Sequence, residues 1–312
     1  MAEMRIIFMG TPEFAADSLR AIIKAGMDVQ AVVTQPDRPK GRGNLLIPSP
    51  VKSLALEAGI RVLQPARAEE SAEILREIAP DFIVVVAFGQ ILRRVVLDIP
   101  RKATVNVHAS LLPKLRGASP INRAIINGDK ETGVTTMLLD EGMDTGNMLL
   151  KEKTPILQDD TASALHDRLA EIGSRLIVET LNNFDSITPA PQNELEATYA
   201  PKLTREDGMI KWSSAAVEIR NLVRGCDPWP AASTWHNGAA LKILHVDAID
   251  SAPTNAAPGE IIEAAGGSLI VAAGSGAVSI REIQREGKKR QPVESFLRGY
   301  SIKTGDRFLQ NA

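Results

Sequence analysis

Residues 82–87 read FIVVVA, a short and almost wholly apolar run. A strand of this composition is typical of a parallel sheet covered on both faces, because neither face of the strand meets water. Similar short runs occur at 4–9 (MRIIFM) and 29–33 (VQAVV), and we expect further strands at 103–107 and 134–140. These runs predict the sheet of an α/β domain.

Helical patterns separate the expected strands. One begins at Pro12-Glu13 and stops at Gly26, and a long amphipathic pattern runs from Thr161, its expected N-cap, to Leu181. Strands that alternate with helices form right-handed βαβ units. The fold class predicted for residues 1–184 is therefore α/β, as a Rossmann-like doubly wound domain.

The pattern changes after residue 184. Residues 185–205 hold three prolines and little periodicity, which is typical of a linker. A short helical pattern at 213–223 is followed by closely spaced short strands, which predict a small, OB-like β-barrel over residues 206–312. The expected strands are 232–236, 241–246, 259–263, 268–272 and 277–282.

Composition limits the possible partners and cofactors. The 312 residues include 36 Lys and Arg against 38 Asp and Glu, so a nucleic acid would have to meet a local basic patch. Cys226 is the single cysteine, which excludes an intramolecular disulfide and a four-cysteine zinc site, and we expect an inert thiol. The four histidines show no metal-ligand spacing, so no metal is expected. With no signal-peptide pattern and no apolar run of the ~18–20 residues that span a bilayer, a cytoplasmic setting is expected.

A polar pair interrupts the strand expected at 103–107. Asn106 and His108 lie two residues apart in NVHASLLP, residues 106–113, so both project from one face near the strand's carboxyl end, where open α/β sheets bind ligands. Histidine can bond an oxygen or move a proton, and an asparagine amide can donate to a developing oxyanion. The pair suits attack on a carbonyl group. From these residues alone, a strand-end histidine satisfied by its neighbours is supported about equally well.

Two further segments are ambiguous when considered alone. Residues 138–146, LLDEGMDTG, form an acidic turn, and an ordinary hairpin turn is the better interpretation. The alternative is that one carboxylate orients His108 or accepts a proton through water. Residues 8–14, FMGTPEF, could seat an anion at a helix start, but they lack GxGxxG, which weakens a dinucleotide-binding dehydrogenase.

In combination, these segments resemble the methionyl-tRNA formyltransferases of the formyltetrahydrofolate-dependent superfamily, nearly end to end. The resemblance is carried by FMGTPEF, VVVAFGQIL, NVHASLLPKLRGASPI, DEGMDTG and CDPWPAA. It implies transfer of a formyl group from 10-formyltetrahydrofolate to methionyl initiator tRNA. Implied partners are the tRNA and the folate, with no membrane, and we expect a monomer.

The resemblance also implies residue roles. The catalytic core would be Asn106, His108 and Asp144. The folate contacts would be Ser110, Leu111, Leu112, Pro113, Phe88, Gly89, Gln90, Ile91, Leu92 and Asp140. Ser119 stands where family members often have alanine, a small change beside the site.

Two basic segments are candidates for contact with tRNA. The resemblance implies that the loop at 35–52 folds over the acceptor end, with Arg42 entering the helix end. Residues 281–303 hold seven basic and three acidic side chains, which gives +4 in a chain of net charge −2. A solvated charged face is possible, but contact with RNA phosphate explains the asymmetry better, and it points to Lys288, Lys289 and Arg290. The tryptophans are expected to pack in the core rather than stack on bases: Trp212, Trp229 and Trp235.

Other functions remain open at this point. A formyltransferase of the same superfamily could use a nucleotide-sugar or glycinamide ribonucleotide amine, and a folate hydrolase would use water. The two basic segments argue against the small-amine acceptors. A non-catalytic RNA-binding protein on a Rossmann-like scaffold is the alternative outside enzymes, and the presence of Asn106, His108 and Asp144 argues against it.

Overall fold

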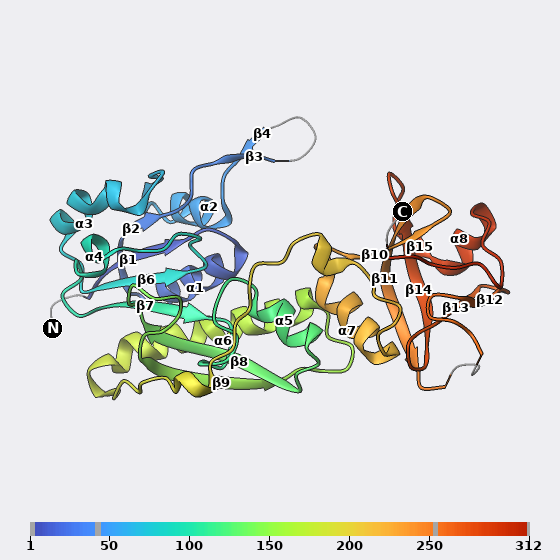
Figure 1. Ribbon diagram of the computed structural model, residues 1–312. Helices are drawn as coiled ribbons and strands as arrows, with labels where there is room; N and C mark the ends of the chain where they lie inside the picture. Colours follow the sequence, from blue (N-terminus) through green and yellow to red (C-terminus); the bar gives the residue numbers. More distant parts are fainter. Residues whose placement is uncertain (1–3, 41–44, 252–254, 311–312) are drawn as a thin grey trace. The chain divides into compact units, whose positions relative to one another are not determined.

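The computed structural model describes residues 4–40, 45–251 and 255–310 (Figure 1). The chain divides into two compact units. The first unit comprises Met1–Pro120, Thr132–Thr154 and His166–Pro201, and the second comprises Ile121–Glu131, Pro155–Leu165 and Lys202–Ala312. Residues 185–201, expected to form most of a linker, thus belong to the first unit, and two short internal segments join the second.

A seven-stranded mixed sheet forms the centre of the first unit, in the order β5-β2-β1-β6-β7-β8-β9. The strands from β5 to β7 run parallel, whereas β8 pairs antiparallel with β7. The order reverses direction between β1 and β6, which is the switch point of a doubly wound sheet. The strands are β1 (Arg5–Gly10), β2 (Asp28–Val33), β5 (Arg61–Leu63), β6 (Phe82–Val86), β7 (Ala103–His108), β8 (Glu131–Leu138) and β9 (Met148–Pro155).

Helices connect these strands (Figure 1). Every residue of β6 is buried, as its sequence predicts. The backbone N–H of Ala164 donates to Thr161 Oγ1 at 3.2 Å, which confirms the expected N-cap of α6. The helices are α1 (Glu13–Lys24), α2 (Pro50–Glu57), α3 (Ala72–Ile78), α4 (Arg94–Leu97) and α6 (Ala162–Asn183), with short 3₁₀ turns η1 (Ala68–Ser71), η2 (Phe184–Ser186) and η3 (Glu194–Glu196).

The segment expected as a plain loop after β2 contains a small hairpin. Strands β3 (Arg38–Lys40) and β4 (Leu45–Ile47) pair antiparallel. At its base, Asp37 forms an ion pair with Lys52 and accepts a hydrogen bond from Gln64 at 2.9 Å. Hydrogen bonds from Lys52 and Gln64 hold the pKa of the Asp37 carboxyl below its usual value. Residue 42, the arginine expected to enter the tRNA, lies outside the described residues.

The second unit is built on an antiparallel sheet in the order β10-β11-β14-β13-β12, with β15 paired to β14. The strands are β10 (Ala232–His236), β11 (Ala239–Ile249), β12 (Ile261–Ala265), β13 (Ser268–Ala272), β14 (Ala277–Arg285) and β15 (Gln291–Pro292). The unit also holds α5 (Pro120–Ile126), η4 (Glu206–Gly208), α7 (Ala216–Cys226) and α8 (Val293–Gly299). Helix α7 begins three residues later than predicted.

Residues 305–309 join the two edge strands of this sheet. Leu309 and Trp235 of β10 exchange backbone hydrogen bonds of 2.8 and 2.9 Å. At the other edge, Ile261 of β12 donates to the carbonyl of Asp306 at 2.8 Å. The two contacts close the sheet into a barrel, in agreement with the predicted fold class.

Within the described residues, no helix is long and apolar enough to cross a membrane.

Candidate active site

The end of β7 carries the two predicted polar residues on one face of the strand. Asn106 lies opposite Val85 on β6, and His108 lies opposite Thr135 on β8. Both residues are buried, with exposed fractions of 8% and 6%. Buried polar side chains normally have hydrogen-bond partners, so their contacts are informative.

The ring of His108 has one hydrogen bond and one acidic neighbour. Its Nε2 lies 3.0 Å from the carbonyl oxygen of Leu115. Because a carbonyl oxygen only accepts, Nε2 carries the hydrogen in this contact. Its Nδ1 lies 3.6 Å from Oδ2 of Asp144. The chain therefore brings an acidic side chain, 36 residues further along, to the predicted histidine.

Asp144 occupies the turn between β8 and β9. Its backbone is left-handed, with φ of 56°, and its Oδ2 accepts a hydrogen bond of 2.8 Å from the backbone N–H of Gly117. A Cβ atom on Gly146 would lie 1.9 Å from the carbonyl oxygen of Leu138, so the turn closes only with glycine there. Gly146 therefore lets the turn close against Leu138, and the Gly117 N–H holds the carboxylate of Asp144 near His108.

The other acidic residues of the turn have different partners. Asp140 organises the turn itself, because it accepts hydrogen bonds from the backbone N–H of Gly142 at 3.0 Å and from the hydroxyl of Thr145 at 2.8 Å. Glu141 is exposed and pairs with Arg94 at 3.0 Å. Of the three carboxylates, Asp144 is therefore the one that faces His108.

The amide of Asn106 forms no hydrogen bond with any described residue. It thus offers an uncommitted donor on the same face of β7 as His108, which suits an oxygen that gains negative charge. Oδ1 of Asp144 likewise has no hydrogen-bond partner among the residues that the structure describes, and it is available to accept a proton.

The loop after β7 is fixed by its own hydrogen bonds. Ser110 is fully buried, and its hydroxyl donates to the carbonyl of Lys114 at 2.6 Å. Thr135 of β8 donates to the Ser110 carbonyl at 2.7 Å and accepts from the Leu112 N–H at 3.2 Å. The hydroxyl of Ser110 is therefore committed to the shape of the loop.

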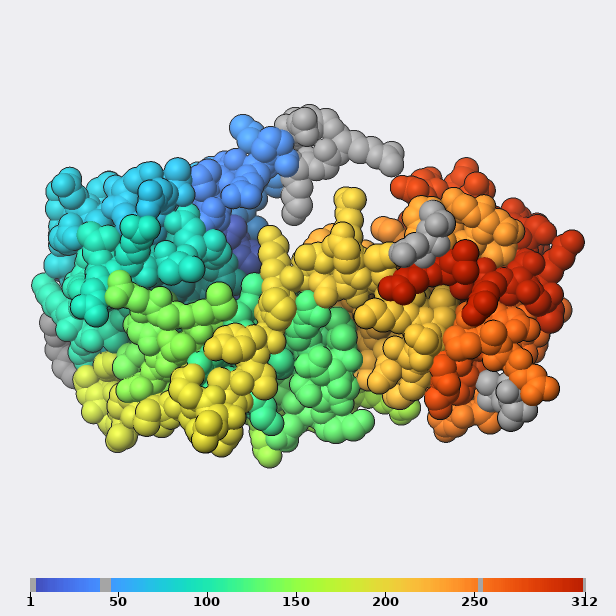
Figure 2. All heavy atoms as spheres, viewed as in Figure 1, coloured from blue at the N-terminus to red at the C-terminus, as the bar shows by residue number. Residues whose placement is uncertain are grey.

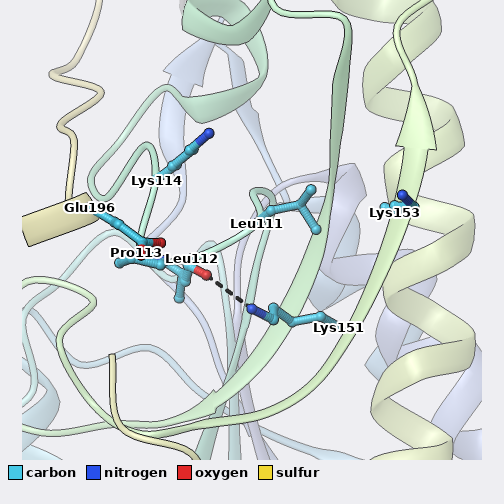
Figure 3. A pocket seen from close by; sticks show the side chains of 7 residues that line it. All are labelled: Leu111, Leu112, Pro113, Lys114, Lys151, Lys153 and Glu196. Carbon is cyan, nitrogen blue, oxygen red and sulfur yellow. Dashed lines mark hydrogen bonds between the residues drawn. The ribbon is translucent and has the colours of Figure 1, made fainter. Parts of the chain in front are cut away.

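A pocket of about 360 Å³ lies beside this loop (Figure 3). Its apolar lining includes three of the predicted folate contacts, and three lysines surround them. Lys151 reaches across to the carbonyl of Leu112 at 3.3 Å. The lining residues are Leu111, Leu112, Pro113, Lys114, Lys151, Lys153 and Glu196. The pocket suits an apolar group that carries negative charge, but it is not lined by Asn106, His108 or Asp144.

The segment 88–92, predicted to contact the folate, divides into core and surface residues. Phe88 and Leu92 are buried in the hydrophobic core of the first unit. The Gln90 side chain bonds the backbone of residues 66 and 68, at 3.1 and 2.9 Å. Gly89 is exposed, and Ile91 is 72% exposed. The backbone around Gly89 and the Ile91 side chain are thus the parts accessible to a ligand.

Sequence reasoning missed one residue that contacts the acidic turn, Gln192, and the role of its partner Arg116. Gln192 donates to the backbone carbonyls of Asp144 and Gly146, both at 2.8 Å, and it accepts from the buried side chain of Arg116. No motif pointed to Gln192, because it lies in a stretch that was expected to be a linker.

The predicted basic segment of the second unit is partly neutralised. Arg290 pairs with Glu282 at 2.6 Å and with Asp227 at 3.5 Å, whereas Lys288 and Lys289 lie exposed in the turn after β14. Neither lysine has an ion-pair partner among the described residues. Trp229 is 51% exposed, so the expectation that it packs in the core was wrong.

No three His, Cys, Asp or Glu side chains within the described ranges converge to hold a metal ion. Cys226 is buried in the second unit, and burial raises the pKa of its thiol to about 12.

Comparison with known proteins identifies the family. The formyl transferase family model matches residues 4–181, and the model of its C-terminal domain matches residues 202–301. The chain is 50% identical to a methionyl-tRNA formyltransferase of Citrifermentans bemidjiense, over 98% of this chain and 96% of the relative. It is 52% identical to one of Pelobacter propionicus, over 98% and 96%.

Solved structures show the same fold at low identity. An N-formyltransferase of Helicobacter canadensis, in complex with folinic acid and dTDP-3-aminofucose, matches with a TM-score of 0.69 at 21% identity, over 90% of this chain and 99% of that one. HypX of Aquifex aeolicus with tetrahydrofolic acid matches with a TM-score of 0.61 at 18% identity, over 95% and 47%. With both domain models matched in order along the chain, this protein belongs to the formyl transferase family.

Proposed function

We propose that the protein transfers the formyl group of 10-formyltetrahydrofolate to the amino group of methionyl initiator tRNA, which yields N-formylmethionyl-tRNA for translation initiation in the cytoplasm. The observation that carries the chemistry is the uncommitted amide of Asn106 beside His108, whose Nδ1 lies 3.6 Å from Asp144. The choice of acceptor is supported by relatives that are about 50% identical over nearly the whole chain.

The first step forms a bond between the amine nitrogen and the formyl carbon, and the formyl oxygen becomes negatively charged. Asn106 donates to this oxygen without rearrangement, because its amide has no other hydrogen bond among the described residues. His108 donates its Nε2 hydrogen to Leu115 in this structure. It stabilises the oxyanion when its Nε2 hydrogen bond moves from the Leu115 carbonyl to the formyl oxygen.

The second step requires one proton to leave the amine and one to reach N10 of the folate as the N10–carbon bond breaks. Asp144 accepts the amine proton at Oδ1, directly or through a water, while Oδ2 remains bonded to Gly117. A second transfer passes this proton from Asp144 to N10, which regenerates the carboxylate. No enzyme nucleophile is needed, because the amine itself attacks.

Apolar and cationic groups near the site suit the folate. Ile91 and Met143, the latter in the acidic turn itself, are exposed by 72% and 56% and offer apolar surface to a planar ring. The pocket in Figure 3 is lined by three lysines around the apolar Leu111–Pro113 loop, and ammonium groups suit carboxylates. Ser110 and Asp140 contribute through loop shape, since their side chains bond within their own loops.

The tRNA would meet exposed groups of the second unit. Lys288 and Lys289 lie in an exposed turn, and Arg290 links this turn to Asp227, two residues before the exposed Trp229. Ammonium groups neutralise RNA phosphates, and an exposed tryptophan can stack on a base. Arg42 would act at the acceptor end. We further propose that the protein is a monomer.

The second candidate is formyl transfer to a small amine such as that of an amino sugar, favoured by the fold shared with the Helicobacter canadensis enzyme. The test is to incubate the protein with labelled 10-formyltetrahydrofolate and either charged methionyl initiator tRNA or a panel of nucleotide-linked amino sugars and glycinamide ribonucleotide. Label on the tRNA supports the proposal. Label only on a small amine would replace it with the second candidate.

A further inference from the structure

Residues 190–200 contact both the turn that carries Asp144 and the loop of Leu115, whose carbonyl bonds His108. Ala190 exchanges backbone hydrogen bonds of 2.8 and 2.9 Å with Met148, just after the acidic turn. Further along, Arg116 donates to Thr198 at 2.9 Å and accepts from Ala200 at 2.7 Å through the backbone. Figure 2 shows the yellow stretch of chain running over the green surface. This segment therefore joins the loop of Leu115 to the turn of Asp144.

The amide of Gln192 is central to this arrangement. Its Nε2 donates to the carbonyls of Asp144 and Gly146, both at 2.8 Å, and its Oε1 accepts from Nε and Nη2 of Arg116 at 3.0 and 2.8 Å. Backbone carbonyls only accept and a guanidinium only donates, so a single orientation of the amide satisfies all four contacts.

Arg116 is itself fixed. Its side chain is fully buried, and it forms a two-point pair with Glu194 through bonds of 2.9 and 2.7 Å. The hydrogen bonds to Glu194 raise the pKa of Arg116, and the guanidinium in turn lowers the pKa of Glu194. Because the Arg116 guanidinium is buried, planar and paired with Glu194, it holds the Gln192 amide in a fixed orientation.

Asp144 needs such support, because its φ of 56° is left-handed. Aspartate enters this region more readily than most residues with a side chain, but a non-glycine residue there still costs roughly 1–3 kcal/mol and persists where surrounding contacts determine it. Gln192 bonds the carbonyl of the strained residue and that of Gly146, two residues later. These two contacts set the direction in which the Asp144 side chain leaves the backbone.

We propose that Gln192 is a positioning residue for formyl transfer: it holds the Asp144 backbone so that the carboxylate faces Nδ1 of His108, and Arg116 orients the Gln192 amide. The inference rests on the proposed function, since it concerns the same reaction.

The test begins with Gln192→Glu, which keeps the size of the side chain and an oxygen for Arg116 but removes both N–H donors to the turn. We expect kcat for formylation of methionyl-tRNA to fall about 10- to 100-fold, with little change in KM for the folate, because the carboxylate is displaced while the binding surfaces remain. Leu195→Ala is the matched control: its side chain is 96% exposed in the same segment, and its kcat should stay at the parent value.

A double-mutant cycle separates positioning from general damage. If Gln192 acts through Asp144, adding Gln192→Glu to Asp144→Asn should leave the residual kcat of Asp144→Asn unchanged. Multiplied losses in the double variant, or a normal kcat in Gln192→Glu, would overturn the inference. Thermal unfolding is followed in parallel; if Gln192→Glu does not fold, Gln192→Asn, which keeps the amide one methylene shorter, takes its place in the cycle.

The parent enzyme distinguishes the two proposals. A parent that does not formylate methionyl-tRNA contradicts the proposed function. A parent that does, together with an unaffected Gln192 variant, contradicts only the role of Gln192.

Discussion

Replacing Asn106 by alanine should separate catalysis from folding. The amide makes no hydrogen bond within the described residues, so its removal breaks none, and we expect the free energy of unfolding to change by about 1 kcal/mol or less. If the amide donates to the oxyanion, its loss removes roughly 2.7–4 kcal/mol of transition-state stabilisation, equivalent to about 10²–10³ in kcat.

Thr180→Val is the matched control with the opposite phenotype. The hydroxyl of Thr180 is fully buried, donates to Leu176 at 2.7 Å and lies 2.8 Å from the hydroxyl of Thr136. Because Thr180 gives its hydrogen to Leu176, Thr136 is the donor in the second contact. The loss of the Thr180 hydroxyl removes the acceptor of the buried Thr136 hydroxyl and should cost about 1–3 kcal/mol of stability. Because these contacts lie in the packing between α6 and the sheet, kcat should stay at the parent value.

Two measurements check this pair. Urea unfolding gives the stability of each variant, and single-turnover formylation at saturating folate and charged tRNA gives the rate of the chemical step. An Asn106→Ala variant that reacts at a near-normal rate would refute the role of the amide. If the rate of each variant fell in step with its free energy of unfolding, the contacts of Asn106 and Thr180 would not distinguish a catalytic effect from a folding effect.

Three further predictions follow from the same contacts. Asp144→Asn should reduce single-turnover formylation far more than Glu141→Gln, because only Asp144 faces His108; equal losses would mean that the turn acts through its overall charge. Neutralising Lys288 and Lys289 should weaken tRNA binding and reduce the log–log salt slope by roughly 0.7–0.9 per phosphate contact, measured in a salt series, with folate binding unchanged; an unaltered slope would exclude phosphate contact by this turn. The thiol of Cys226, with its pKa raised to about 12 from an ordinary 9.0, should contain about 10³ times less thiolate than in the unfolded chain and resist iodoacetamide at pH 8 until urea is added. Rapid alkylation of the native protein would contradict the burial of the thiol. The raised pKa also makes a contribution to stability that is fully present below pH 9 and is lost as pH rises toward 12.

The sequence alone predicted those elements whose hydrophobic or polar pattern is clear. The apolar run at 82–87 became the fully buried β6, and the spacing of Asn106 and His108 placed both on one face of β7. Strand β9 was not predicted, because four of its eight residues are polar or charged and stand in one run, Lys151–Thr154, without the alternation typical of a strand. The hairpin of β3 and β4 was missed because a proline stands in one three-residue strand.

The approach of Asp144 to His108 could not be derived from local spacing. It depends on a left-handed residue in the turn and on the backbone N–H of Gly117 in another loop. The family resemblance supplied this residue, whereas physical reasoning from the turn alone favoured an ordinary hairpin. Neither the family resemblance nor the local sequence pointed to Gln192, because its partner Asp144 is 48 residues away and no motif surrounds it.

The closure of the barrel by residues 305–309 has a consequence for how the second unit is made. The hydroxyl of Thr234 in β10 donates to the carbonyl of Leu309 at 2.9 Å, across 75 residues of chain. Until that late segment has been synthesised, β10 and β12 remain unpaired strand edges, which are the surfaces that recruit strands of other molecules. Contacts so distant in sequence also form slowly. The nascent chain therefore passes through an interval in which its barrel is open and most prone to association, and that interval ends when residues 305–309 pair with both edges.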